Sequence, residues 1–169
     1  SEMCIRDRID TMILQIVGMK NSGKTTLMNH AISFLKERGY SVVTIKHHGH
    51  IGEEIELQSS DVDHMKHFAA GADQSIVQGH HLQQTVTRKK KQSLREIIEN
   101  SVTIDCSIIL VEGFKEANYD KIIVYKNNDE LRSLQGLSHV IGKIETNHPR
   151  ASNQLEHLLN KLIKDKGMN

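Results

Sequence analysis

Apolar residues along this chain form short runs of strand length that alternate with longer segments of helical periodicity. The strand-like runs cover residues 12–17, 41–46, 106–111, 121–125 and, more weakly, 138–141. The helical patterns cover residues 24–38, 61–70 and 93–100, and a last one opens at Pro149. This alternation predicts a three-layer α/β fold, with a mainly parallel sheet and helices on both faces.

Two stretches stand apart from that alternation. Residues 74–78 and 82–87 read as two strands around Gly79-His80, which favours a hairpin. Residues 47–60 have little periodicity and predict a long loop, a feature that is often functional in compact domains. No internal repeat or second domain is evident, so we expect one domain over residues 12–169.

The first residues do not join this pattern. Ser1 to Arg8 are polar and unpatterned, and we exclude them from the fold. We therefore expect a native start near Met12, with residues 1–11 as a non-native or disordered leader.

Composition narrows the class of protein without naming it. The 169 residues carry a formal net charge of +1, which gives no argument for a nucleic-acid partner. The short basic run Arg88–Lys91 reads as a solvated loop. No run of about 18 apolar residues predicts a membrane span, and two cysteines, Cys4 and Cys106, form no disulfide framework. We expect a cytoplasmic protein without a membrane or nucleic-acid partner.

The residues between the first predicted strand and helix match G-x-x-x-x-G-K-T, from Gly18 to Thr25. In that context the pattern indicates a loop that holds the phosphates of a purine nucleoside triphosphate. Gly18 and Gly23 permit close backbone approach, so that loop amides and the helix N-terminus surround an anion. Lys24 is expected to reach the β- and γ-phosphates, and Thr25 to give a hydroxyl to Mg²⁺.

Two acidic residues are candidates to serve the metal. Glu112 follows a buried run, and ligands of parallel sheets lie beyond the carboxyl ends of the strands. There it would hold Mg²⁺ through a water or orient an attacking water, unless it is an ordinary strand-end acid. Asp63, at the start of a short helix, is the second candidate and Asp61 competes with it. Either can equally be a helix N-cap.

Histidines are numerous, with 11 in the chain, and three of them lie in Lys46-His47-His48-Gly49-His50. This segment ends the second predicted strand at the expected ligand edge. Lys46 and His47 would contact phosphate there, or the histidines would bind a transition metal, or the loop is simply solvated. No cysteine pair accompanies them, so a structural zinc site is a poor match.

Four segments, in this order, resemble the molybdopterin-guanine dinucleotide biosynthesis protein B (MobB) family. They are Val17–Leu27, Lys46–His50, Asp63 with Ala70-Gly71-Ala72, and Leu110-Val111-Glu112-Gly113-Phe114-Lys115. The resemblance covers Met12 to about Glu145. The Asn-Lys-x-Asp signature of many GTPases is missing, and residues 126–129 are only a loose echo of it.

The resemblance implies a P-loop GTP-binding protein with at most slow GTPase activity. Such proteins form dimers and are thought to assist the guanylyltransferase that joins GMP to molybdopterin, so that enzyme and other molybdopterin enzymes are the expected partners. The expected cofactors are GTP and Mg²⁺. The metal would lie near Thr25, Asp63 and Glu112, and the catalytic contributions would come from Lys24 and Glu112. The expected nucleotide contacts are Gly18, Lys20, Asn21, Ser22, Gly23, Lys24, Thr25, Thr26, Lys46 and His47.

Two other functions stay open at this point. A nickel-type metallochaperone GTPase would use His47, His48 and His50 as a cargo site. A small-molecule kinase would need arginines in a lid, for which the run beginning at Arg88 is the candidate.

Overall fold

A computed structural model describes residues 11–49 and 52–168, and the chain divides into two compact units. The first unit comprises residues 1–49 and 94–169, and the second comprises residues 50–93. We describe each unit by itself. The expected leader over residues 1–11 lies, except for Thr11, outside the described residues, and the single domain over residues 12–169 stays a prediction.

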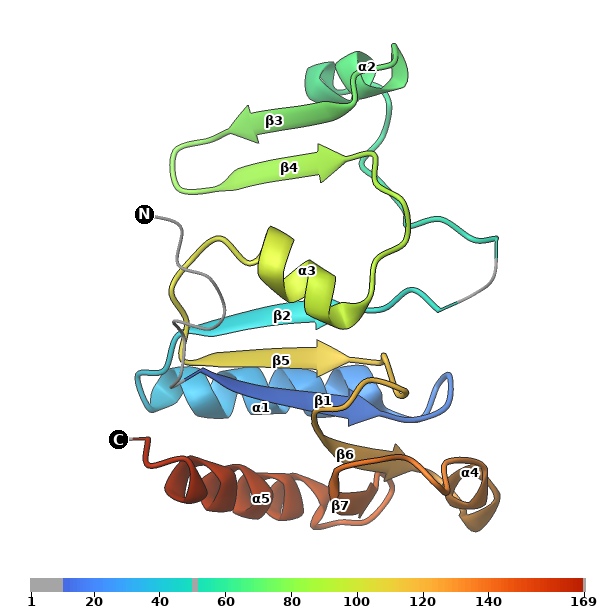
Figure 1. Ribbon diagram of the computed structural model, residues 1–169, viewed down its shortest axis with the longest axis vertical. Coiled ribbons are helices and arrows are strands. Elements are labelled where there is room, and N and C mark those ends of the chain that lie inside the picture. The colour runs from blue at the N-terminus through green and yellow to red at the C-terminus, as the bar shows by residue number, and fades with distance from the viewer. Residues whose placement is uncertain (1–10, 50–51, 169) are drawn as a thin grey trace. The chain divides into compact units, whose positions relative to one another are not determined.

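The first unit is built on a five-stranded sheet in the order β2-β5-β1-β6-β7, and every neighbouring pair is parallel (Figure 1). The strands are β1 (Met12–Val17), β2 (Val42–Lys46), β5 (Ile108–Glu112), β6 (Asp120–Tyr125) and β7 (Val140–Glu145). The helices are α1 (Lys24–Glu37), α3 (Leu94–Ser101), α4 (Asn128–Ser133) and α5 (Ala151–Asp165). Within the described residues, no helix combines the length and apolarity needed to cross a bilayer.

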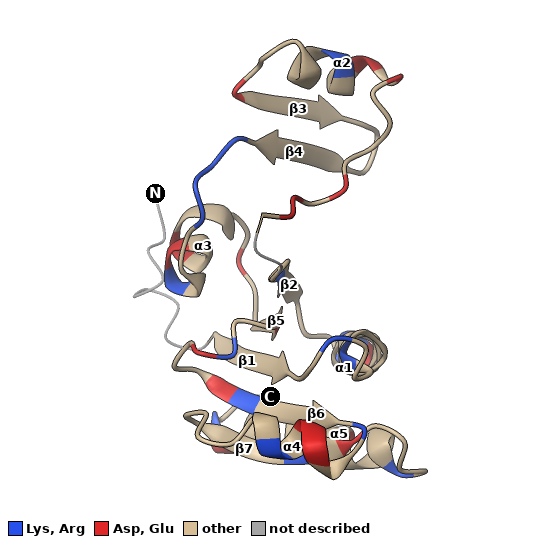
Figure 2. Ribbon diagram, turned by 90° about the vertical axis from the view of Figure 1, so that its right-hand side faces the viewer, with Lys and Arg blue, Asp and Glu red and all other residues tan. Residues whose placement is uncertain are grey.

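The apolar run of β5 shows why the unit has three layers. Successive side chains of a strand point to opposite faces of its sheet. Ile108 and Leu110 join the core under α1 and α5, whereas Ile109 and Val111 join the core under α3. Figure 2 shows α1 and α3 on opposite sides of the strands. The predicted α/β fold with helices on both faces of a parallel sheet is confirmed.

The last strand differs from its prediction. β7 spans Val140–Glu145, whereas the sequence pattern favoured residues 138–141. Lys143 and Glu145 are exposed on this edge strand, so its second half lacks a continuous apolar run. Gly142 adds to the interruption, but a Cβ there would lie 2.5 Å from Leu158 Cδ1 of α5. Glycine is therefore the residue that lets α5 pack closely on the strand.

The helix α4 was not predicted. Asn127 begins it, because its side-chain oxygen accepts a hydrogen bond from the backbone N–H of Glu130 at 2.9 Å. Glu130 in turn accepts one from the backbone N–H of Lys126 at 2.9 Å. These are the residues that loosely echo a guanine-binding signature, and their described contacts cap a helix.

The second unit contains the helix α2 (Asp63–Ala69) and the antiparallel strands β3 (Gln74–Gln78) and β4 (Gln83–Thr87). The hairpin prediction is confirmed. Ser75 on β3 donates a hydrogen bond to His64 O of α2 at 3.0 Å, which ties the helix to the hairpin.

Arg88 also contributes to the packing of the second unit. Its guanidinium lies 4.0 Å from the centre of the Phe68 ring and donates to Phe68 O at 2.8 Å. Arg88 is nevertheless exposed and lies in a loop, as the basic run predicted.

Lys121, at the start of β6, is a fully buried lysine. Its ammonium donates to Ala117 O at 2.7 Å, Tyr119 O at 3.1 Å and Ser138 O at 2.7 Å. An ammonium has three donors, and all three are used here. The side chain therefore joins the segment before β6 to the segment before β7.

Replacing this lysine tests how much the fold depends on that junction. We expect Lys121→Met to lower the free energy of unfolding by about 2–3 kcal/mol, because three buried carbonyls lose a charged donor. Urea unfolding measures the loss, and Lys126→Met, which changes an exposed lysine just after the other end of the same strand, is the matched control. Equal urea midpoints for the two variants would show that the junction contributes nothing.

Candidate functional site

The loop between β1 and α1 is shaped by close backbone contacts. A Cβ on Gly18 would lie 2.6 Å from both Ser22 Oγ and Val124 O, so only glycine fits there. Asn21 has φ 61° and Gly23 has φ 92°, both in the left-handed region that glycine tolerates freely and asparagine better than most residues. The sequence thus allows the tight turn that brings the chain back over the start of α1.

The N-terminus of α1 is open to an anion. Gly23 is its N-cap residue, no side chain caps the helix, and its first turn contains no acidic residue. The first amides of a helix have no partner within the helix and carry the positive end of its dipole. In addition, Ser22 Oγ is buried without a hydrogen-bond partner among the residues that the structure describes. Both observations fit a bound phosphate group.

Lys24 lies over this loop as a fixed positive charge. Its ammonium donates to Gly18 O at 2.9 Å and to Met19 O at 2.7 Å, which accounts for two of its three donors. Burial lowers the pKa of Lys24 below its ordinary value of 10.5, against the opposing attraction of Glu112; the positive charge of Lys46 lowers the pKa further. A phosphate at the loop would supply the negative charge and the acceptor that the ammonium lacks.

Glu112 is brought to this loop by strand register. β5 lies between β1 and β2, and Glu112 pairs with Ile16 on one side and Lys46 on the other. Glu112 is buried, with only 7% of the residue exposed. Its Oε1 accepts a hydrogen bond from Thr25 Oγ1 at 2.9 Å. Lys46 Nζ lies 3.6 Å from Oε2. A hydroxyl and a carboxylate side by side are hard oxygen ligands of the kind that Mg²⁺ takes, so this pair fits that ion.

The turn after Glu112 has an unusual backbone. Gly113 has φ 96° and Phe114 has φ 55°, so two successive residues are left-handed. A Cβ on Gly113 would lie 3.1 Å from His47 Cβ, and the Phe114 ring stacks on the His47 ring with centroids 4.4 Å apart. His47 also donates its backbone N–H to Glu112 O at 3.0 Å. The ends of β2 and β5 are therefore packed together beside the loop.

Most of the residues expected at the site lie together at this edge of the sheet. They are the loop residues from Gly18 to Thr26, together with Lys46, His47 and Glu112, and of these Met19, Lys20, Asn21, Thr25, Thr26 and Lys46 are exposed.

Asp63 belongs to the second unit, which we describe by itself. Its side chain is 93% exposed and lies 4.0 Å from Lys66 Nζ, so its role at the metal stays a prediction. The predicted histidine cargo site includes His50, which lies outside the described residues. Among the residues that are described, no cluster of three or more metal-ligating side chains occurs.

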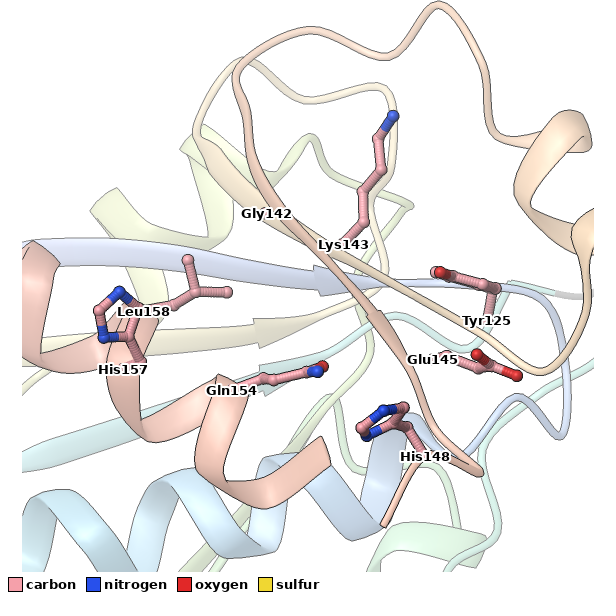
Figure 3. A pocket seen from close by; sticks show the side chains of 8 residues that line it. All are labelled: Tyr125, Gly142, Lys143, Glu145, His148, Gln154, His157 and Leu158. Atoms are coloured by element: carbon pink, nitrogen blue, oxygen red, sulfur yellow. The ribbon is translucent and has the colours of Figure 1, made fainter. Parts of the chain in front are cut away.

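A cleft of about 340 Å³ lies beside the ends of β6 and β7 and the first turns of α5 (Figure 3). Tyr125, His148 and Gln154 are among its lining residues, and none of the phosphate-loop residues lines it. Thr146 follows the lining residue Glu145 in the sequence. It packs against the phosphate loop, since a Cβ on Gly23 would be 3.0 Å from Thr146 Cγ2. The sequence pattern gave no sign of this contact.

Comparison with known proteins shows which family this chain resembles. The family model for molybdopterin guanine dinucleotide synthesis protein B (MobB) matches residues 13–145. A probable molybdopterin-guanine dinucleotide biosynthesis adapter protein of Bacillus subtilis is 36% identical over 127 residues, which are 75% of this chain and 72% of that protein. The adapter protein of Haemophilus influenzae is 29% identical over 138 residues, or 81% and 75% of the two chains.

Solved structures show the same fold. The crystal structure of Bacillus subtilis MobB superposes with a TM-score of 0.69 at 27% identity, covering 92% of this chain and 97% of that one. The resemblance found in the sequence is confirmed. Since the family model spans most of the chain, including both strand ends that form the site, the chain belongs to the MobB family.

Proposed function

We propose that this protein is a GTP-binding adapter of molybdenum cofactor biosynthesis. It would assist the guanylyltransferase that joins GMP to molybdopterin, as the names of its relatives suggest. One observation carries the nucleotide part of the proposal. The open N-terminus of α1, the Lys24 ammonium and the Thr25–Glu112 pair meet at one edge of the sheet.

Each residue of the site has a definite task in this proposal. The loop amides and Ser22 Oγ bind the phosphates, and Lys24 gives its remaining donor to them. Thr25 and Glu112 hold Mg²⁺, with Glu112 acting directly or through a water. Mg²⁺, when bound, neutralises charge on the β- and γ-phosphates. Lys46 and His47 would extend the phosphate contacts, and Asp63 would be a further ligand of the metal.

Hydrolysis is expected to be slow. Residues 18–26, 46–49 and 112–115 contain no arginine that would stabilise the transition state of phosphoryl transfer. Lys20, exposed on the loop, or a residue from the second subunit of a homodimer would have to replace it. The protein would then act by presenting a nucleotide-ordered surface to its partner enzyme in the cytoplasm.

The preference for guanine rests on family membership. Lys126 and Asn127, in the segment that loosely echoes the Asn-Lys-x-Asp signature, are engaged with Glu130 in starting α4. The proposal therefore requires GTP to be separated from ATP by experiment.

The first prediction concerns the nucleotide. We expect wild-type protein to bind GTP in a Mg²⁺-dependent manner and more tightly than ATP, and Lys24→Ala to lose most of that affinity, by at least about tenfold. One lost charge-assisted contact, worth about 1.5–3 kcal/mol, is enough for that. Isothermal titration with GTP and with ATP, with and without Mg²⁺, measures both effects. Lys36→Ala, at the far end of the same helix, is the control. ATP binding as tightly as GTP would refute the guanine preference.

The second prediction concerns pH. The ammonium form of Lys24 binds phosphate, so affinity is fully present below the lowered pKa of Lys24 and falls as pH rises through it. Each pH unit above that pKa reduces the ammonium fraction about tenfold. Lys24→Arg keeps its charge throughout, so its affinity, although lower, should not share this alkaline decline. If the GTP affinity of the two proteins changed in parallel between neutral and alkaline pH, the role of the Lys24 ammonium in phosphate binding would be contradicted.

The third prediction concerns the partner. We expect the immobilised protein to retain molybdenum cofactor guanylyltransferase more strongly with Mg²⁺ and a non-hydrolysable GTP analogue than with GDP. Thr25→Ala should remove the difference, because the metal would lose its hydroxyl ligand. Retention of the enzyme measured by surface plasmon resonance gives the comparison, and absence of binding in every nucleotide state would refute the adapter role.

A further inference from the structure

Gln15 is a polar residue in the most protected strand of the first unit. It lies in β1, between β5 and β6, and is fully buried (Figure 1). Its side chain points to the same face as that of Ile13, which packs against the apolar core containing Ile109 and Val111. Burying an amide among such residues is unfavourable unless the amide is hydrogen-bonded. Its presence at this position therefore calls for a physical reason.

The Gln15 side chain bonds the turn that follows Glu112. Its Nε2 donates to Gly113 O at 3.0 Å and to Phe114 O at 2.7 Å. Both partners are carbonyl oxygens, which only accept, so the amide nitrogen must face them. Both hydrogens of one side-chain amide thus hold two successive carbonyls.

That turn needs holding because its backbone is unfavourable. Gly113 and Phe114 both have positive φ, a conformation that is costly for a side chain such as that of Phe114. It persists only where surrounding contacts determine it. Other described contacts also hold this turn: the His47–Phe114 stack, the Gly113 N–H, which donates to Ile16 O at 3.0 Å, and the Ala117 N–H, which donates to Phe114 O at 2.8 Å.

We propose that Gln15 is a positioning residue for the metal site. By holding the Gly113–Phe114 turn, it sets the direction in which the Glu112 carboxylate leaves β5, and hence the contact of Glu112 with Thr25. The inference rests on the proposed function only in naming Mg²⁺ as the ion that Glu112 serves. Gln15 itself touches neither Thr25 nor Lys24 in any described contact, so it acts through the turn.

The orientation of the amide argues against a role in core stability alone. Gln15 Oε1 is buried and has no hydrogen-bond partner among the described residues. An apolar side chain of similar volume would avoid that unmet acceptor. What only the glutamine provides at this position is the pair of donors that holds the turn.

The first arm of the test needs no nucleotide. In Gln15→Leu, amide hydrogen exchange should become faster in residues 112–118, while α5 and β7 keep wild-type exchange. Gln154→Leu, an exposed glutamine on α5, is the matched control and should leave residues 112–118 unchanged. Unaltered exchange in residues 112–118 of a folded Gln15→Leu would overturn the proposal.

The second arm measures the coupling to the metal. We expect Gln15→Leu to raise the Mg²⁺ concentration for half-maximal tightening of GTP binding about tenfold, since outer-sphere partners of metal ligands have effects of that size. GTP binding without Mg²⁺ should stay within about twofold of wild type. In a Glu112→Gln background the same change should add nothing, because the carboxylate that it positions is gone. An effect of equal size in both backgrounds would show that Gln15 does not act through Glu112.

A third variant keeps the proposal open to refutation if Gln15→Leu does not fold. Gly113→Ala strains the same turn from its other side, against His47, and should produce the same rise in Mg²⁺ requirement. An unchanged requirement in that variant would overturn the proposal. If wild-type protein bound no nucleotide, the proposed function and the coupling would fall together, whereas the exchange arm would still decide whether Gln15 holds the turn.

Discussion

The parallel register of β1, β5 and β2 is the constraint on which the site depends. Because β5 lies between the other two strands, its last residue, Glu112, is a register partner of both Ile16 and Lys46. The phosphate loop leaves β1 two residues after Ile16, and α1 brings Thr25 back to the carboxylate. A slip of one residue would point Glu112 to the opposite face of the sheet, away from Thr25. Because the side chains of β5 pack into cores on both faces of the sheet, a slipped strand would have to repack both cores at once.

Close packing around the loop then leaves little freedom for its shape. Gly18 touches Val124 of β6, and Gly23 touches Thr146 after β7. The loop is thus supported by strands that contribute no predicted ligand. This support explains why β6 and β7 matter for the site, although the residues that the sequence motifs single out lie beside β1, β2 and β5. A site for phosphate depends as much on the backbone that faces its glycines as on the charges that it presents.

The sequence predicted the parts of this protein that are determined locally. A strand-length apolar run, a glycine pair and an amphipathic helix lie within a few residues of each other, so the loop and the class of fold could be predicted. Glu112 and Lys46 could also be placed at the ligand edge, because the carboxyl ends of parallel strands meet there. The detailed side-chain contacts between distant segments, such as that of Gln15 with the turn after Glu112, could not be predicted. Gln15 was counted as part of an apolar run, although a single polar residue in a strand buried on both faces is itself a signal. The helix begun by Asn127 was missed because it is short, and the bounds of β7 were wrong because exposed residues and Gly142 interrupt its pattern.

The charges of the site explain why the arrangement suits a ligand. Lys24 and Lys46 both lie near Glu112. The Lys46 ammonium lies 3.6 Å from Glu112 Oε2, and Thr25 already donates a hydrogen bond to the other carboxylate oxygen. Two cations thus share one carboxylate, and one of them, Lys24, is half-buried and has a lowered pKa because burial disfavours its charge. The negative charge of a polyphosphate would compensate the buried positive charge of Lys24, and a divalent cation would compete with Lys46 for Glu112. Phosphate and metal would therefore favour each other at this edge of the sheet, because each supplies the charge that the other leaves unmatched. The buried clamp of Gln15 on the turn beside Glu112 is what would keep the carboxylate in place while that exchange of partners occurs.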